Sequence, residues 1–178
     1  LYLFFSTLDF SFILSVIFAV ISGVLLGWLM NFAIFKPLRK RGGSTVTLFM
    51  ASFALLILIE SMILIFFGAD VKTIGFIEVT KGVEFFGAVI TPLQMFIVAI
   101  SVILLFTLFY LMKWTKIGKA MRAVADNKEV SEIIGISSER IYVYAFVIGS
   151  ALAGVAGILV GMEQNLEPTI GTNLIIKG

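Results

Sequence analysis

The sequence contains neither cysteine nor histidine, and their absence removes many kinds of chemistry. Without cysteine the chain can form no disulfide, thiol nucleophile or thiolate metal site. Without histidine it has no His-based triad, no imidazole metal ligand and no ordinary near-neutral general base. Hydrolytic or metal chemistry would rest on carboxylates alone, so we expect no catalytic residue, no metal site and no cofactor bound by this chain.

Charged residues are also scarce. They make up 13% of the 178 residues, whereas hydrophobic residues make up 60% and the mean hydropathy is +1.13. A soluble domain is roughly half apolar and a quarter charged, so this is the composition of a membrane protein. We interpret residues 1–178 as a single membrane domain and expect it to be a fragment of a longer subunit, truncated at both ends.

Four apolar segments are long enough to cross a membrane as helices. A hydrocarbon core of ~30 Å needs about twenty residues at ~1.5 Å rise per residue. The segments are Phe12–Phe35, Val46–Phe67, Leu93–Met112 and Ile141–Met162, and residues 1–5 look like the end of an earlier helix. The sequence therefore predicts an all-α integral membrane protein, a polytopic helical bundle with four complete transmembrane helices.

The basic residues lie mainly in two of the connecting segments. Ten of the thirteen Lys and Arg residues follow the first or the third span, and three lie on the other side. Cytoplasmic loops carry the excess of Lys and Arg in membrane proteins, so residues 36–45 and 113–140 are predicted to be cytoplasmic. The ten are Lys36, Arg39, Lys40, Arg41, Lys113, Lys116, Lys119, Arg122, Lys128 and Arg140.

Pro37 predicts the end of the first span. The residue before a proline avoids the α-helical region, so the helix is expected to stop near Phe35. Gly42 and Gly43 would then complete the turn into the second span.

The loop from Gly68 to Thr91 is rich in Val, Ile, Phe and Gly. Lys81-Gly82, between the segments IEV and VEF, could turn a small hairpin. An irregular cap over the helix ends explains the composition equally well. In either form, the loop is a candidate docking surface for an extracytoplasmic partner.

Glu60 is the only acidic residue within a predicted span, and no Lys or Arg lies in any of the four. Ionisable groups in membranes are candidates for substrate or ion pathways. A protonated Glu that bridges helices is an equally good interpretation, with Ser22 and Ser101 as hypothetical partners at similar depth. The sequence leaves Glu60 as either part of a translocation path or a buried bridge.

A short capped helix is predicted between the third and fourth spans. Asp126 or Asn127 supplies an N-cap with Glu129 following closely, and Gly135 supplies the C′ position. Between them Val130, Ile133 and Ile134 form one apolar stripe, with Glu129 and Glu132 off it. Interfacial helices usually carry a basic polar face, so this acidic one favours docking into a groove of a soluble partner over the lipid surface.

The fourth span, which Ser138 and Glu139 are expected to cap, carries a stripe of small residues. Gly149, Ala153, Gly157 and Gly161 recur at every fourth position, with Ser150 and Gly154 alongside. Small residues allow close approach of another helix, and lipid offers no hydrophobic drive for association. The stripe predicts a tight helix–helix contact and says nothing about a substrate.

The sequence resembles the branched-chain amino-acid permease group of prokaryotic ABC importers. Glu129-Val130-Ser131 with Gly135 resembles the coupling motif EAA-xxx-G, although Val130 is bulkier than the usual small residue. The resemblance covers nearly the whole chain. Further matching segments are Pro37-Leu38-Arg39, Phe67-Gly68-Ala69-Asp70, Gly118, Arg122-Ala123, Ala125, Asn127, Gly135-Ile136, Arg140, Phe146, Gly149, Leu152-Ala153-Gly154 and Ala156-Gly157.

This resemblance implies a transport subunit in the prokaryotic plasma membrane that works with ABC ATPase subunits, a second permease subunit and an extracytoplasmic substrate-binding protein. It implies that about Asn127 to Ile134 docks on the ATPase, with Glu129, Val130, Ile133, Ile134 and Gly135 as coupling residues. The chain lacks G-x-x-x-x-G-K-[ST], so ATP and Mg²⁺ would bind the partner and not this chain. No nucleic-acid partner is expected.

The expected function is inward transport of branched-chain or other hydrophobic amino acids. A permease for another small solute, such as a simple sugar, is the nearest alternative, because related importers share the architecture. An integral membrane enzyme would need at least two converging catalytic groups, and a channel would favour stripes of pore-lining charge. Neither pattern is visible in the spans.

Overall fold

The computed structural model describes residues 11–68, 83–85 and 88–163. Its helices are α1 (Phe12–Met30), η2 (Asn31–Phe35), α2 (Lys36–Lys40), α3 (Thr45–Phe67), α4 (Pro92–Trp114), α5 (Lys116–Asp126), α6 (Lys128–Ile133) and α7 (Ser138–Glu163). Four stretches are long and apolar enough to cross a membrane: Phe12–Lys40, Thr45–Phe66, Pro92–Trp114 and Ser138–Glu163. The predicted polytopic helical bundle is confirmed, and the predicted end of an earlier helix at residues 1–5 lies outside the described residues.

The first span does not stop before Pro37, so that prediction is wrong. The helix passes through the π-helical turn η2 and continues as α2 to Lys40. The backbone N–H of Lys36 donates to the carbonyl of Asn31, which closes the wider turn. Pro37 then falls in the first turn of α2, where its missing N–H costs little. Gly42, with φ of 74°, provides the predicted turn into α3.

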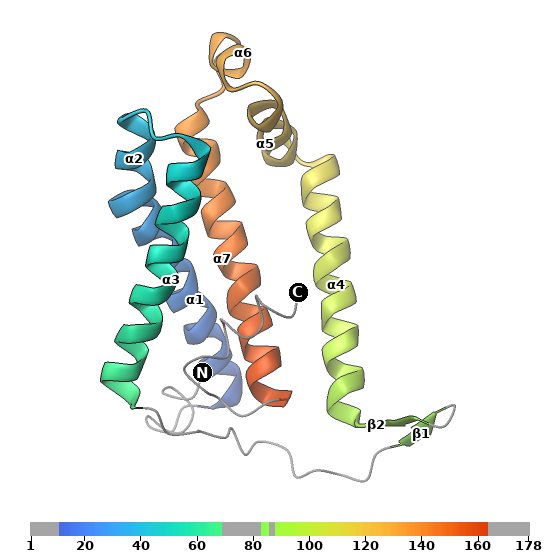
Figure 1. Cartoon of the computed structure of the whole chain (residues 1–178). Coiled ribbons are helices and arrows are strands. Elements are labelled where there is room, and N and C mark those ends of the chain that lie inside the picture. Colours follow the sequence, from blue (N-terminus) through green and yellow to red (C-terminus); the bar gives the residue numbers. More distant parts are fainter. Residues whose placement is uncertain (1–10, 69–82, 86–87, 164–178) are drawn as a thin grey trace.

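The closest helix packing joins α1 to α7 (Figure 1). A Cβ added to Gly27 would lie 2.5 Å from Cβ of Ser150, and one added to Gly154 would lie 3.6 Å from Cα of Val20. Two backbones can approach this closely because both helices present small residues at the contact. The α1–α7 pair therefore forms the centre of the described bundle.

The predicted stripe on α7 lies next to this contact. Gly149, Ala153 and Gly157 are exposed, and Gly161 is buried. A Cβ added to Gly149 or Gly157 would meet nothing within 4 Å. Helix α1 thus uses the adjacent face with Ser150 and Gly154, and contact of another helix with the stripe itself stays a prediction.

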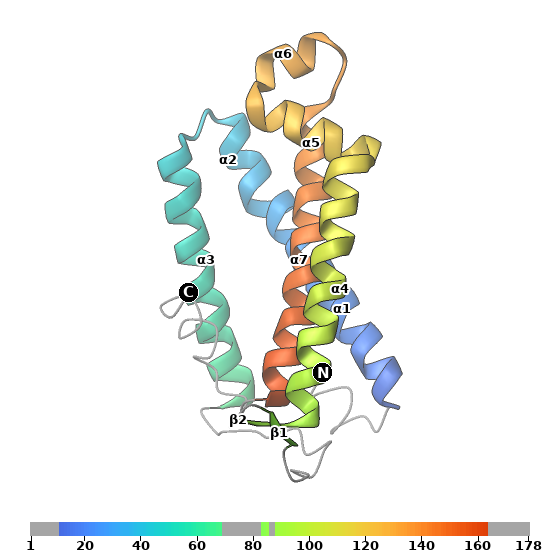
Figure 2. The same cartoon turned by 90° about the vertical axis from the view of Figure 1, so that its right-hand side faces the viewer.

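Helices α3 and α4 lie on either side of α7 (Figures 1 and 2). Both expose large apolar side chains along most of their length, with Ile65 at 79% and Phe106 at 65%. Apolar surface of this extent suits lipid or further helices.

The loop before α4 contains a small antiparallel hairpin. Strand β1 (Val83–Phe85) pairs with β2 (Ala88–Ile90) in a register that places Val83 opposite Ile90. One of the two interpretations of this loop was a hairpin turned at Lys81-Gly82, the other an irregular cap. Those two residues and the partner segment IEV lie outside the described residues. The observed strand VEF pairs instead with the segment that follows it.

Candidate functional site

The two basic segments lie at the same end of the bundle, as the charge distribution predicts. Figures 1 and 2 show α2, α5 and α6 at this end and the β1–β2 hairpin at the other. We call the first the basic end. It holds the predicted coupling residues and a polar cluster that the sequence did not predict.

Helix α5 folds back sharply from the end of α4. The side chain of Thr115 accepts a hydrogen bond from the backbone N–H of Gly118 at 3.1 Å. Arg122 donates to the carbonyl of Met112 at 2.7 Å, so it satisfies one of the free carbonyls at the end of α4. A Cβ on Gly118 would overlap the carbonyl oxygens of Leu111 and Met112, which explains glycine at this corner.

Helix α6 begins and ends at the predicted positions. Asn127 is the N-cap, and its Oδ1 accepts a hydrogen bond from Val130 N–H at 3.0 Å. At the other end Gly135 has φ of +88°, Ile136 N–H donates to the Ser131 carbonyl at 2.9 Å, and Gly135 N–H donates to the Glu132 carbonyl at 3.1 Å. These two bonds form a Schellman motif, so α6 is held by caps at both ends.

The apolar stripe of α6, Val130, Ile133 and Ile134, is exposed. Ile133 is 84% exposed, Ile134 66% and Val130 53%, whereas Ser131 is 2% exposed. Glu129 and Glu132 are also exposed, and both lie off the stripe. Figure 2 shows α6 beyond the ends of the spans. A helix this short needs packing to persist, so the exposed stripe is suited to docking into an apolar groove.

The Schellman motif gives a testable prediction at Gly135. Gly135→Ala is expected to destabilise the local structure by about 1–2 kcal/mol, because a Cβ disfavours the left-handed region by that amount. Amide hydrogen exchange at Ser131–Ile136 should accelerate roughly five- to thirty-fold. Gly135→Asn is the control, since Asn tolerates the left-handed region. Its exchange rate should fall between those of the unmodified chain and the Ala variant. Equal exchange rates in the Ala variant and the unmodified chain would contradict the Schellman motif at Gly135.

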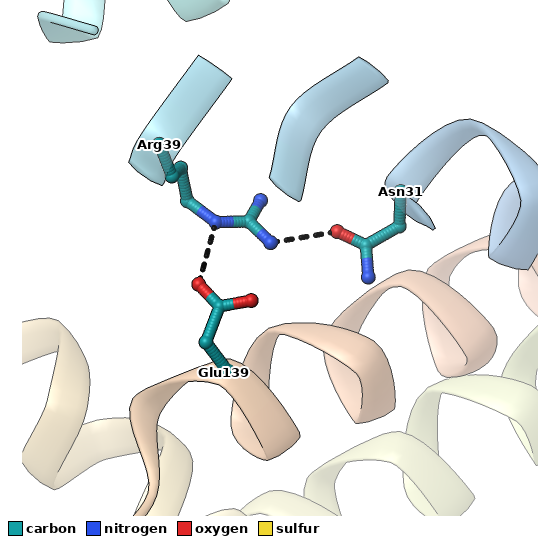
Figure 3. Close-up of polar contacts among 3 residues, drawn as sticks. All are labelled: Asn31, Arg39 and Glu139. Atoms are coloured by element: carbon teal, nitrogen blue, oxygen red, sulfur yellow. Dashed lines mark hydrogen bonds and ion pairs between the residues drawn. The ribbon is translucent and has the colours of Figure 1, made fainter. Parts of the chain in front are cut away.

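A cluster of polar side chains joins the two basic segments (Figure 3). Arg39 on α2 pairs with Glu139 in the first turn of α7 at 3.5 Å from Nε to Oε1, and its Nη2 donates to Oδ1 of Asn31 at 2.8 Å. The guanidinium carbon also lies 4.3 Å from the centroid of the Tyr142 ring. We call Asn31, Arg39, Glu139 and Tyr142 the Arg39 cluster.

From the sequence, Arg39 was counted among the basic loop residues and within a segment that matches the permease family, and no contact was predicted for it. Its side chain is in fact 10% exposed, and Asn31 is 1% exposed. Two signals could have indicated the cluster: an amide inside an apolar span, and an acid in the first turn of the fourth span. Arg39 and Glu139 are 100 positions apart in the sequence, so their contact could not be predicted from local patterns.

Glu60 lies half-buried on α3. The hydroxyl of Ser22 donates to the carbonyl of Ala19 at 2.8 Å, and Ser101 is exposed on α4, so contact of either residue with Glu60 stays a prediction. The choice between a translocation path and a buried bridge stays open. Among the described residues, no three carboxylates gather as a set of metal ligands.

Comparison with known proteins gives one family. The family model for the permease component of branched-chain amino acid transport systems matches residues 1–178. No solved structure gives a significant match.

Three relatives show the extent of the similarity. The chain is 36% identical over 86 residues to the high-affinity branched-chain amino acid transport system permease protein BraD of Pseudomonas aeruginosa, covering 48% of this chain and 28% of the relative. It is 34% identical over 89 residues to LivH of Escherichia coli K12, covering 49% and 29%. It is 29% identical over 181 residues to a probable branched-chain amino acid transport permease protein, LivH, of Methanocaldococcus jannaschii, covering 92% and 52%. The chain thus spans about half the length of these relatives or less.

Proposed function

Because the chain belongs to the permease family of branched-chain amino acid transport systems, we propose that it is part of the membrane-spanning permease subunit of a prokaryotic ABC importer. The subunit moves branched-chain or other hydrophobic amino acids inward, and a partner ATPase hydrolyses the ATP. The observation that most supports this proposal is the exposed apolar stripe of α6, located where the resemblance puts the coupling motif.

The orientation follows from the charges. Residues 36–45 and 113–140 carry ten of the thirteen basic residues and face the cytoplasm of the prokaryotic cell. Helix α6 is then within reach of a cytoplasmic ATPase, and the β1–β2 hairpin is on the side of an extracytoplasmic substrate-binding protein (Figure 1). ATP and Mg²⁺ bind to the ATPase, and this chain supplies only the docking surface.

The mechanism is mechanical. The stripe of Val130, Ile133 and Ile134 inserts into a groove of the ATPase, and closure of two ATPase subunits moves α6. Only residues 134–137 separate α6 from α7, so the movement reaches the α1–α7 pair at the centre of the bundle. A second permease subunit completes the pathway, and the exposed stripe of Gly149, Ala153 and Gly157 is a surface where one of its helices, or a further helix of this subunit, can pack closely.

Uptake by the reconstituted importer tests the substrate. We expect the complex of full-length permease, ATPase and binding protein to accumulate labelled leucine in vesicles when ATP is present, and to accumulate no labelled ribose. A complex that lacks ATP is the control for passive leakage. Accumulation of ribose without leucine would assign the sugar-transport alternative, and accumulation of neither would reject the proposed class of substrate.

A further inference from the structure

We infer that the Arg39 cluster transmits the movement of α6 to the first membrane helix. The inference rests on the proposed function, because it concerns how the movement driven by the ATPase spreads through the permease. It assigns Arg39, Glu139 and Asn31 as positioning residues.

The first step is the rigid connection between α6 and α7. The Schellman motif at Gly135 fixes the exit from α6, and only Ile136 and Ser137 separate that glycine from α7. The carbonyl of Ser137 accepts a hydrogen bond from Ile141 N–H at 3.2 Å, and Ser138 is 1% exposed. Only residues 134–137 connect α6 to α7, and the Schellman motif fixes the first part of that connection, so we expect a displacement of α6 to reach the first turn of α7, where Glu139 lies.

The second step crosses from α7 to the first span. Glu139 Oε1 lies 3.5 Å from Nε of Arg39, and Arg39 is held on two further sides, by the Asn31 amide at 2.8 Å and by the Tyr142 ring. The planar guanidinium fork matches acceptors in fixed directions, so the position of Arg39 depends on both carboxylate and amide. Figure 3 shows the guanidinium between the two acceptors.

The third step concerns the π turn. Asn31 begins η2 and Arg39 lies beyond its end on α2, so their hydrogen bond spans the turn. The Asn31 carbonyl accepts the Lys36 N–H that closes the turn, while its side chain accepts from Arg39. Single π turns in α-helices often lie at functional positions, since they change the direction of the helix locally. The Arg39 cluster therefore links the two ends of this turn to the start of α7.

Together these contacts connect α1 and α7 at two levels. The Arg39 cluster joins them at the basic end, and the Gly27–Ser150 and Gly154–Val20 contacts join them within the membrane. The two helices should move as one body when α6 moves. The side chain of Glu139 is 38% exposed, and a partly exposed ion pair contributes little to stability, so a role in geometry fits the cluster better than a role in stability.

The test compares coupling with stability in the reconstituted importer. We expect Arg39→Gln and Glu139→Gln to lower the amount of leucine taken up per ATP hydrolysed by roughly ten-fold, within the range of known coupling energies. Arg41→Gln is the matched control, because Arg41 lies in the same basic segment and is exposed. The exchanged pair R39E/E139R recreates the ion pair but lacks the bond to Asn31 and the contact with Tyr142, so it should recover only part of the loss, to a ratio about three-fold below that of the unmodified complex. Assembly with the ATPase should be unchanged in every variant.

A distance measurement tests the same inference without transport. The chain has no cysteine, so cysteines placed at the exposed positions Lys40 and Arg140 can carry spin labels on either side of the cluster. One narrow distance distribution is expected with and without ATP in the unmodified complex, and a broad one in Arg39→Gln. Arg39→Lys, which keeps the charge but loses the fork, is used if the Gln variants do not fold and should broaden the distribution partly.

Two outcomes would overturn the inference: Gln or Lys variants that match the unmodified complex in both assays, or an unmodified complex whose label distance changes with ATP. A loss of uptake in which the thermal stability falls in parallel and R39E/E139R restores neither would show that the cluster only supports the fold. Failure of the unmodified complex to transport leucine would count against the proposed function, and the label distances in the purified permease would still decide the role of the cluster.

Discussion

Replacing Ile133 with Asp is expected to weaken binding of the ATPase to the permease strongly while the permease stays folded. Ile133 is 84% exposed, so a carboxylate at this position is solvated in the free chain and has little effect on folding. In the docked state the same carboxylate would lie unpaired in an apolar groove. A central interface residue of this kind is worth about 2–4 kcal/mol, which corresponds to a loss of affinity of roughly 30- to 1,000-fold. Binding of the purified ATPase to the permease in nanodiscs measures the affinity directly.

Two variants in the same helix control for this result. Lys128→Asp places a carboxylate on the face of α6 opposite the stripe, so the affinity should change much less than in Ile133→Asp. Ile133→Val keeps an apolar branched side chain and should bind within a few-fold of the unmodified permease. Unaltered binding of the Ile133→Asp variant, or an equal loss in Lys128→Asp, would show that the ATPase does not recognise the apolar stripe.

The features of α6 could be predicted from the sequence because their causes are local. The Asn127 cap involves an N–H three residues away, and the Schellman motif at Gly135 involves carbonyls of the preceding turn. Such signals depend on neighbours in sequence, so they survive without knowledge of the tertiary fold. The four spans were predictable for a similar reason, since the thickness of the membrane sets the length of an apolar helix.

The first span shows where local reasoning fails. Pro37 predicts the end of a helix if every turn of the span is assumed to be α-helical. The structure instead inserts the π turn η2, with Pro37 in the first turn of the continuing helix. The bond between Arg39 and Asn31 spans that turn, and Glu139 contributes from a position 100 residues away. Contacts over such separations leave no periodic pattern in the sequence.

The small residues of α7 show a different failure. The spacing of small residues on α7 does not show which face contacts another helix. Both the face with Gly149 and Gly157 and the adjacent face with Ser150 and Gly154 carry side chains small enough for close approach. The deciding information lies on α1, where Gly23 and Gly27 form their own small-xxx-small pair and meet the second face. A comparison of the two helices, rather than of α7 alone, would have indicated this pairing.

Replacing Gly27 with Leu is accordingly expected to disrupt the centre of the bundle. Even the first side-chain carbon would lie 2.5 Å from Cβ and Oγ of Ser150, and 3.5 Å from the carbonyl of Phe146. Rotation of the Ser150 hydroxyl cannot relieve the clash with its Cβ, so α1 and α7 must separate. Overpacking of a close contact costs about 1–3 kcal/mol and occasionally more, and we expect a loss of about 3 kcal/mol in the free energy of unfolding. Unfolding by titration with SDS in mixed micelles measures it.

Gly149→Leu is the matched control for this prediction. It makes the same change in the middle of an apolar helix, with the same gain in helix propensity, but its Cβ meets nothing within 4 Å. The free energy of unfolding of the single chain should therefore change by no more than about 0.5 kcal/mol. The difference between the two variants isolates the α1–α7 contact from the general effect of a larger side chain. Equal stability of both variants would mean that the bundle is not held together at Gly27 and Ser150, and a greater loss in Gly149→Leu would place the central contact on the predicted stripe instead.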